Sequence, residues 1–222
     1  MLTIACVWVR SEVYGTPEWV HRLYRMVTNH IGAGDLPGNE YRFLCVTPHW
    51  EEFKGQKEIL AVPPVLVPPP GLPKWWYKLN LFELPGERVL YFDLDVVITA
   101  PVRDLVNFPS DFVVAPSSGV PMRGHDFNSS VMAWNPEGQQ AKFIRDAIKK
   151  GVPYFRFAGD QQWLSSLPIR VDLYPSRWVK KYLPKGGVQP PAPGTIVTLL
   201  TQGGKNQALI DAGHTWIAEY WR

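Results

Sequence analysis

The sequence predicts a single α/β domain built on a mostly parallel central sheet with helices on its faces. Short apolar segments rich in β-branched residues alternate with amphipathic segments, which is the pattern of strands connected by helices. Several of the expected strands are apolar on both sides, as in sheets that are covered on both faces. The chain has 222 residues, of which 45% are hydrophobic and 19% are charged. This composition suits one folded domain and excludes disordered and fibrous classes.

The first elements set the expected topology. Residues 2–9 are a nearly continuous apolar run that predicts a buried strand. A helix follows, with Thr16 as its N-cap and Pro17 at its first position. A strand, helix, strand, strand opening implies a right-handed crossover and a parallel sheet. The further elements expected are strands at 41–46, 59–62, 88–93, 112–115, 131–134, 169–173 and 196–200 and helices at 75–84, 137–150, 160–167 and 206–213.

Composition also excludes several function classes. The net charge of +3 is too small to indicate a nucleic-acid-binding protein, although it leaves room for a local cationic pocket. No stretch approaches the roughly 20 apolar residues of a membrane helix, and the N-terminus lacks the features of a secretory signal. We therefore expect a soluble, cytoplasmic protein without a membrane span. Cys6 and Cys45 lie in apolar strand segments, which favours reduced core thiols over a disulfide.

The segment 62–73 is rich in proline, and strand and helix signals lie within a few residues on either side. This proximity favours a rigid loop inside the domain over a linker between domains. We find no internal repeat and no clear domain boundary elsewhere in the chain.

Two carboxylates follow the strongest expected strand. Asp93 and Asp95 are spaced i, i+2, so in an extended chain both side chains lie on one face. At the carboxyl end of a parallel strand, that face opens on the crevice where α/β folds bind ligands. Two hard oxygen ligands at this spacing suit Mg²⁺ or Mn²⁺ and leave positions open for phosphate oxygens. The alternative for so short a motif is that one aspartate caps the following turn and the other is solvated.

The residues around this motif resemble a known family. The string VLYFDLDVVI, preceded by WWYKLNLF and followed by FNSSVMAWN and GDQQWL, resembles the GT-A glycosyltransferases. The likeness is to the glycogenin-like and lipopolysaccharide-galactosyltransferase-like group, including short phage and bacterial relatives, and it covers most of the chain in order. It implies one GT-A domain over residues 1–222, with a nucleotide-binding half at 1–100 and a sugar and acceptor half at 101–222.

The resemblance also implies ligands and residue roles. Asp93 and Asp95 match the pair that holds Mn²⁺ or Mg²⁺ on the diphosphate of a nucleotide sugar, here most readily a UDP-sugar. Gln202 stands where larger relatives place a metal-binding histidine, and its carbonyl oxygen is a poorer ligand. The nucleotide-sugar-binding residues that the resemblance implies are Val9, Arg10, Tyr14, Lys78, Asp93, Leu94, Asp95, Asn128, Gly159, Asp160, Gln161, Gly203 and Lys205.

Two residues match catalytic positions of the family. Asn128 matches an asparagine that meets the donor sugar, and Asp160 matches an aspartate that lies beside the anomeric carbon. Lys205 matches a lysine that stabilises the departing diphosphate. Each of these residues also has a plainer interpretation, in which Asp160 caps a helix and Lys205 is a solvated lysine. We interpret His214, further along, as a surface residue near the C-terminus.

The aromatic residues leave alternatives open. Trp75 and Trp76 either stack on sugar or base or pack in the core. Trp216, Tyr220 and Trp221 near the C-terminus either bind the acceptor, pack on the core or contact a second subunit, so a homo-oligomer stays open.

The sequence thus predicts a metal-dependent glycosyltransferase, of the retaining type by resemblance, with an unknown acceptor. One alternative is a phosphatase of the haloacid dehalogenase type, whose first motif is also a strand ending in Asp-x-Asp. It is disfavoured because the motif begins only at Asp93 and no later acidic pair completes a Mg²⁺ site. The other alternative is a non-catalytic nucleotide-sugar or carbohydrate-binding module, with Gln202 marking a decayed metal site.

Overall fold

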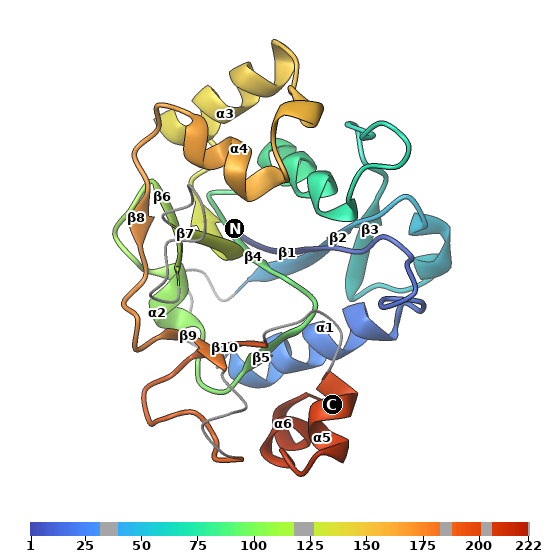
Figure 1. Cartoon of the computed structure of the whole chain (residues 1–222), viewed down its shortest axis with the longest axis vertical. Helices are drawn as coiled ribbons and strands as arrows, with labels where there is room; N and C mark the ends of the chain where they lie inside the picture. Colours follow the sequence, from blue (N-terminus) through green and yellow to red (C-terminus); the bar gives the residue numbers. More distant parts are fainter. Residues whose placement is uncertain (32–39, 118–126, 183–187, 201–205, 222) are drawn as a thin grey trace.

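The computed structural model describes residues 1–31, 40–117, 127–182, 188–200 and 206–221. A seven-stranded sheet with the order β3-β2-β1-β4-β7-β6-β8 forms its centre, and helices cover both faces (Figure 1). A second sheet has the order β5-β10-β9. The strands are β1 Leu2–Val7, β2 Tyr41–Val46, β3 Ile59–Val62, β4 Arg88–Phe92, β5 Val96–Ile98, β6 Phe112–Pro116, β7 Phe127–Trp134, β8 Asp172–Leu173, β9 Val179–Tyr182 and β10 Val197–Leu200.

The central sheet is mostly parallel, as the sequence predicts. β1 pairs in parallel with β2 and with β4, β2 with β3, and β6 with β8. β7 is antiparallel to both of its neighbours, β4 and β6. Side chains along each strand alternate between the two faces, so Leu90 and Phe92 join one core while Val89 and Tyr91 join the other.

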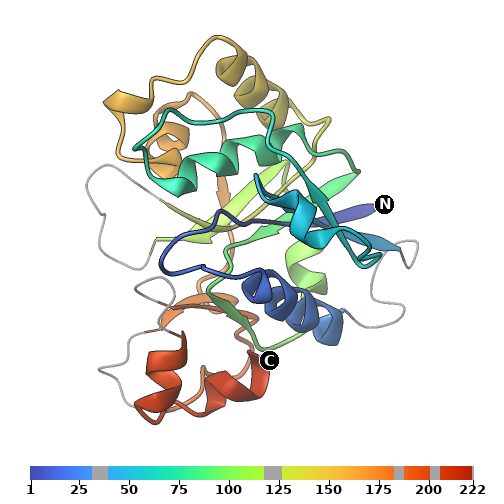
Figure 2. The same cartoon turned by 90° about the vertical axis from the view of Figure 1, so that its right-hand side faces the viewer.

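The two cores contain side chains from opposite faces of the sheet, and Figure 2 shows the elements that cover each face. On one side α1 (Glu18–His30) buries Val20, Leu23, Met26 and Val27, a spacing that gives a helix one apolar face. The small sheet and the C-terminal helices lie on this side as well. The other side is covered by the 3-10 helix η2 (Lys74–Glu83) and by α3 (Gln139–Lys149) and α4 (Asp160–Ser166). The remaining helical elements are η1 Trp50–Phe53, α2 Arg103–Val106, η3 Tyr154–Arg156, α5 Asn206–Asp211 and α6 Trp216–Tyr220.

Some elements differ from those that the sequence predicts. The expected helix at 75–84 is a 3-10 helix, and the expected strand at 169–173 shortens to the two-residue β8. β7 begins at Phe127, four residues before the expected start. The sequence also missed β5, β9, α2 and α6, which span three to five residues each and are too short to show a period.

Near the C-terminus, aromatic side chains pack on the core. Trp221 is 5% exposed, and its ring lies against that of Trp19 with the guanidinium of Arg22 stacked 4.0 Å from its centre. The expectation that His214 lies at the surface is wrong: it is buried, with Nδ1 2.5 Å from the Tyr182 hydroxyl. Trp216 of α6 packs edge-on against Tyr182 of β9, and of the three strands of this small sheet the sequence predicts only β10. Among the described helices none is long and apolar enough to span a membrane.

One buried side chain, that of Asn80, clamps the proline-rich segment onto η2. Its Oδ1 accepts a hydrogen bond from the backbone N–H of Leu66 at 2.6 Å. Its Nδ2 donates to the carbonyl oxygens of Leu66 at 2.8 Å and Tyr77 at 3.0 Å. Because Asn80 is only 4% exposed, water does not compete well for these bonds. The segment is therefore tied to the element that forms one wall of the cavity described below.

Replacing Asn80 with alanine should lower the free energy of unfolding by about 1–3 kcal/mol, because the backbone groups of Leu66 lose their partners. Denaturant unfolding measures this change. The matched control is Asn29→Ala on the exposed face of α1, which should change stability by less than about 0.5 kcal/mol. Equal effects of the two substitutions would show that the clamp does not stabilise the fold.

Candidate active site

A cavity of about 390 Å³ opens at the carboxyl ends of β1 and β4. Its lining comes from the end of β1, the turn after β4, the middle of β7 and the loop that enters α4, with η2 as a wall. The lining includes nine of the residues that the sequence predicts to bind a nucleotide sugar: Val9, Tyr14, Lys78, Asp93, Leu94, Asp95, Gly159, Asp160 and Gln161.

Asp93 and Asp95 reach the cavity through a turn, not through an extended strand. β4 ends at Phe92, and the backbone N–H of Asp93 donates to the carbonyl oxygen of Ser130 at 2.8 Å. Leu94 and Asp95 then form a turn that leads into β5. Both carboxylates line the cavity, although the backbone between them forms a turn and not the predicted extended strand. Their role as metal ligands stays a prediction.

Lys78 joins the acidic residues in a buried network. Its Nζ lies 2.9 Å from Oδ1 of Asp93 and donates to the Ser129 hydroxyl at 3.4 Å. The Ser129 hydroxyl in turn donates to Oδ2 of Asp160 at 2.9 Å. The Tyr91 hydroxyl also donates to Asp93. We call Lys78, Asp93, Ser129 and Asp160 the Lys78 network.

The network holds the ammonium group of Lys78 at the largely buried wall of the cavity. Burial lowers the pKa of Lys78, but the carboxylates of Asp93 and Asp160 outweigh this effect and raise the pKa overall. Burial raises the pKa of Asp160, and the attraction of Lys78 and the hydrogen bond from Ser129 offset part of that rise. Lys78 therefore stays protonated and compensates part of the acidic charge.

Asp95 carries the clearest sign of uncompensated charge. Burial and repulsion from Asp93 raise its pKa to about 6, against a smaller opposing effect of Lys78 and the Tyr14 hydroxyl. Burial and the two aspartates also raise the pKa of Tyr14, so its hydroxyl remains a neutral donor. Among the described residues, the carboxylates of Asp93, Asp95 and Asp160 line the cavity together with two lysines, Lys78 and the exposed Lys74. Acidic groups still outnumber basic ones there, and an added dication would relieve the excess.

The donor set fits a hard divalent cation. Carboxylate oxygens from Asp93 and Asp95 are the ligands that Mg²⁺ and Mn²⁺ prefer. Within the described ranges no group of three or more His, Cys, Asp or Glu side chains is placed to hold a metal. The third predicted ligand, Gln202, lies outside the described residues, as do Gly203 and Lys205.

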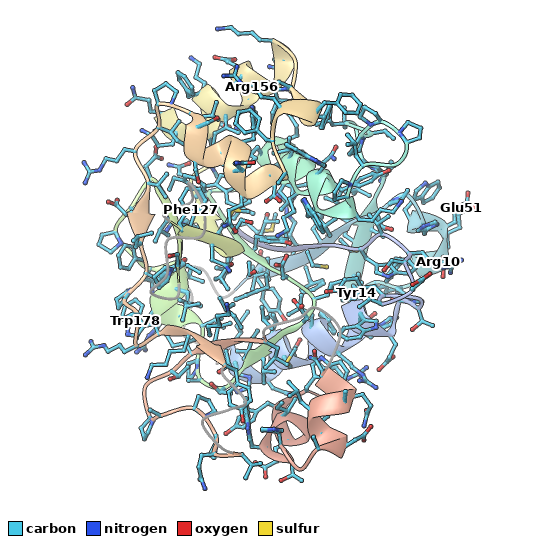
Figure 3. The ribbon with its side chains drawn as sticks, viewed as in Figure 1. Arg10, Tyr14, Glu51, Phe127, Arg156 and Trp178 are labelled. Atoms are coloured by element: carbon cyan, nitrogen blue, oxygen red, sulfur yellow. The ribbon has the colours of Figure 1, made fainter. Side chains whose placement is uncertain are left out.

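Two predicted residues lie away from the cavity. Arg10 is exposed at the edge of the molecule (Figure 3), where both oxygens of Glu52 accept hydrogen bonds from its Nη2 at 2.7 Å. Asn128 does not line the cavity, and its Oδ1 accepts a hydrogen bond from the backbone N–H of Ser130 at 2.7 Å. Figure 3 shows Tyr14 further in than Arg10. The roles predicted for Arg10 and Asn128 stay predictions.

The sequence reasoning missed some lining residues. Tyr91 precedes Asp93 by two positions, so strand alternation could have placed both side chains on one face. Ser129 belongs to the Phe-Asn-Ser motif, in which only Asn128 has a predicted role. Trp75, for which stacking on sugar or base was one of two predicted roles, also lines the cavity. The lining residues without a predicted binding role are Val7, Lys74, Tyr91, Ser129, Ser130, Ala158 and Gln162.

Comparison with known proteins places this geometry in a recognised fold. No family model matches the sequence, and no curated protein does. Solved structures match instead. The galactosyltransferase LgtC, in complex with donor and acceptor sugar analogs, aligns with a TM-score of 0.56 and 14% identity over 98% of this chain and 94% of its own. The glycosyltransferase GlyE of Streptococcus pneumoniae gives 0.63 and 11% over 98% of this chain and 62% of its own.

A third match is mouse xyloside xylosyltransferase 1, with a TM-score of 0.53 and 11% identity over 88% of this chain and 96% of its own. Identities this low define the fold alone. The chain has the GT-A glycosyltransferase fold, as the sequence predicts.

Proposed function

We propose that the protein is a metal-dependent glycosyltransferase that moves a sugar from a nucleotide sugar, most readily a UDP-sugar, to an acceptor hydroxyl. The observation that carries the proposal is that Asp93 and Asp95 line one cavity together with Lys78 and Asp160. Residues suited to a metal-bound diphosphate, Asp93 and Asp95, therefore lie in the same cavity as a carboxylate suited to a sugar, that of Asp160. The similarity to solved glycosyltransferases supports this proposal, and the narrower glycogenin-like grouping stays a prediction.

The order of residues along the cavity suggests how a donor binds. Val9 and Tyr14, after β1, offer an apolar and aromatic surface for the nucleoside. The diphosphate would lie at Asp93 and Asp95, and Asp160 would lie at the sugar. Asp93 and Asp95, with Gln202 as the proposed third ligand, would hold a divalent ion, which would supply positive charge against the diphosphate. Lys205 would add a second positive charge there.

The protein's own groups prepare the transfer. Lys78 holds Asp93 and, through Ser129, Asp160, so both carboxylates are fixed before the donor arrives. In the reaction the bond from the anomeric carbon to the diphosphate oxygen breaks, and the diphosphate keeps the electron pair. The acceptor oxygen bonds to the anomeric carbon, and its proton passes to the departing diphosphate. Asp160 stabilises the positive charge on the sugar ring, and we expect retention of configuration.

The two alternatives are less well supported. A phosphatase of the haloacid dehalogenase type is disfavoured because Asp93 follows the fourth strand and the matching solved structures are glycosyltransferases. A binding module without catalysis is less well supported, because the matching solved structures are glycosyltransferases and the proposed catalytic carboxylate, Asp160, lines the cavity.

Titration calorimetry with UDP, with and without Mn²⁺, tests the proposal first, and assays of UDP release from UDP-glucose, UDP-galactose and UDP-N-acetylglucosamine follow. We expect UDP to bind at least about tenfold more tightly with Mn²⁺, because the ion links the carboxylates to the diphosphate. At least one donor should release UDP only when the metal is present.

The outcomes separate the candidate functions. Metal-dependent binding of UDP with no turnover of any donor would support the binding module and contradict the transferase. Hydrolysis of a simple phosphomonoester with Mg²⁺ would support the phosphatase. Asp104→Asn, which removes an exposed carboxylate from α2, serves as the control and should behave like the wild type.

A further inference from the structure

The structure separates two neighbouring tryptophans that the sequence could not distinguish. Trp76 is fully buried and packs edge-on against Tyr154 with 5.0 Å between ring centres. Trp75 is 49% exposed and lines the cavity. The core interpretation is therefore right for Trp76, whereas the side chain of Trp75 is left available to a ligand.

Trp75 is held in one orientation by the loop that enters α4. Its Nε1 donates a hydrogen bond to the carbonyl oxygen of Ala158 at 3.1 Å. The N–H of Ala158 donates to Oε1 of Gln162 at 2.7 Å, which fixes that peptide. Gly159 leaves room for the indole, because a Cβ at this position would lie 2.3 Å from Nε1. Three separate features thus fix a ring that is half-exposed, and an ordered aromatic ring binds without a large loss of side-chain entropy.

The position of Trp75 relative to Asp160 indicates which ligand it meets. Asp160 directly follows Gly159 and is 3% exposed, so it belongs to the floor of the cavity. Trp75 contacts the same loop but is open to solvent, so it belongs to the rim. In the proposed donor arrangement the sugar lies at Asp160, and a group between that sugar and solvent would lie against Trp75.

We propose that Trp75 forms the acceptor subsite and stacks on the pyranose ring of a sugar acceptor. The C–H face of a pyranose carries a slight positive charge and the face of the indole a negative one, so the two surfaces are complementary. This inference rests on the proposed function, because the donor defines which side of the cavity remains for the acceptor. The inference about Trp75 identifies the acceptor as a carbohydrate, whereas the fold and the proposed metal site leave the class of acceptor open.

Ligand-observed saturation-transfer NMR tests the inference with methyl α- and β-glucosides and methyl α- and β-galactosides, added to the protein with UDP and the diamagnetic ion Mg²⁺. The wild type should transfer saturation to the ring C–H protons of at least one glycoside. Trp75→Ala should weaken that binding about tenfold, and Trp75→Phe should keep part of it. Gly159→Ala should act like Trp75→Ala, since the new methyl group displaces the indole.

Trp50→Ala is the matched control, because Trp50 is also partly exposed but lies on η1 and does not line the cavity. Circular dichroism confirms folding of each variant, and calorimetry with UDP and Mn²⁺ should show affinities within about twofold of the wild type for Trp75→Ala. The inference is overturned if Trp75→Ala binds the glycosides as tightly as the wild type does, or if its affinity for UDP falls by the same factor as its affinity for the glycosides. It is also overturned if the wild-type UDP complex binds no glycoside. A wild type that does not bind UDP overturns the proposed function instead.

Discussion

Asp95→Asn is expected to abolish metal-dependent UDP release and, in the absence of metal, to make the protein more stable at pH 7. Loss of a direct metal ligand should cost more than the roughly hundredfold upper range seen for outer-sphere partners. The gain in stability follows from the pKa of Asp95, which burial and Asp93 raise to about 6 in the folded protein. Above that pH the folded chain has to keep Asp95 ionised in an unfavourable site.

The raised pKa of Asp95 determines how the stability of the protein changes with pH. An aspartate with a raised pKa in the folded state contributes its full stability below the pKa of the unfolded chain, and this contribution is lost as the pH rises through about 6. Asp95→Asn should match the wild type near pH 4 and exceed it by roughly 2–3 kcal/mol at pH 7. Subtracting the free energy of unfolding of the wild type from that of Asp95→Asn at each pH removes the contribution of the other carboxylates.

Denaturant unfolding at pH 4, 5, 6 and 7, repeated with Mn²⁺, measures this behaviour. Mn²⁺ should stabilise the wild type and leave Asp95→Asn unchanged, because only the wild type keeps both carboxylates. Asp104→Asn is again the control and should respond to Mn²⁺ as the wild type does. Unchanged UDP release in Asp95→Asn, or stabilisation of that variant by Mn²⁺, would remove Asp95 from the metal site.

Lys78→Met is expected to give the largest loss of stability. It removes the ammonium group 2.9 Å from Asp93 and leaves the partly buried Asp93 and the buried Asp160 without their internal cation. Breaking a buried pair by removing one partner costs about 3–5 kcal/mol. UDP release should also be lost, since Asp93 and Asp160 are no longer held in place.

A second substitution separates electrostatic from packing effects. Lys78→Met combined with Asp160→Asn lowers the uncompensated charge, so it should recover part of the lost stability but none of the activity. Lys74→Met removes an exposed lysine from the same 3-10 helix and is the control for stability. If the double variant were no more stable than Lys78→Met, the loss would come from packing, and the charge argument would be wrong.

The sequence predicts the sheet well because burial on both faces leaves a direct mark on composition. β1, β2 and β4 are apolar in nearly every position, and their parallel pairing follows from the strand and helix order. The direction of β7 was not predictable in this way. A central strand is apolar whether it runs parallel or antiparallel, so its residues do not record its direction.

The site was predictable only in part, for a similar reason. Asp93 and Asp95 stand out because carboxylates seldom follow so apolar a strand without a function. The ion pair of Lys78 with Asp93 depends on how η2 packs across the sheet, and that packing leaves no pattern in the sequence. η2 is a 3-10 helix, whose period of about three residues also decides which of Trp75 and Trp76 is buried.

Cys6 and Cys45 are aligned on the neighbouring strands β1 and β2, and both are free and fully buried in the core that α1 covers. A thiol reagent in solvent reaches them only when this core opens. The rate of alkylation therefore reports how often α1 and the sheet come apart, without any introduced label. Slower alkylation with UDP and Mn²⁺ than without them would mean that donor binding at the strand ends also stabilises the core beneath α1.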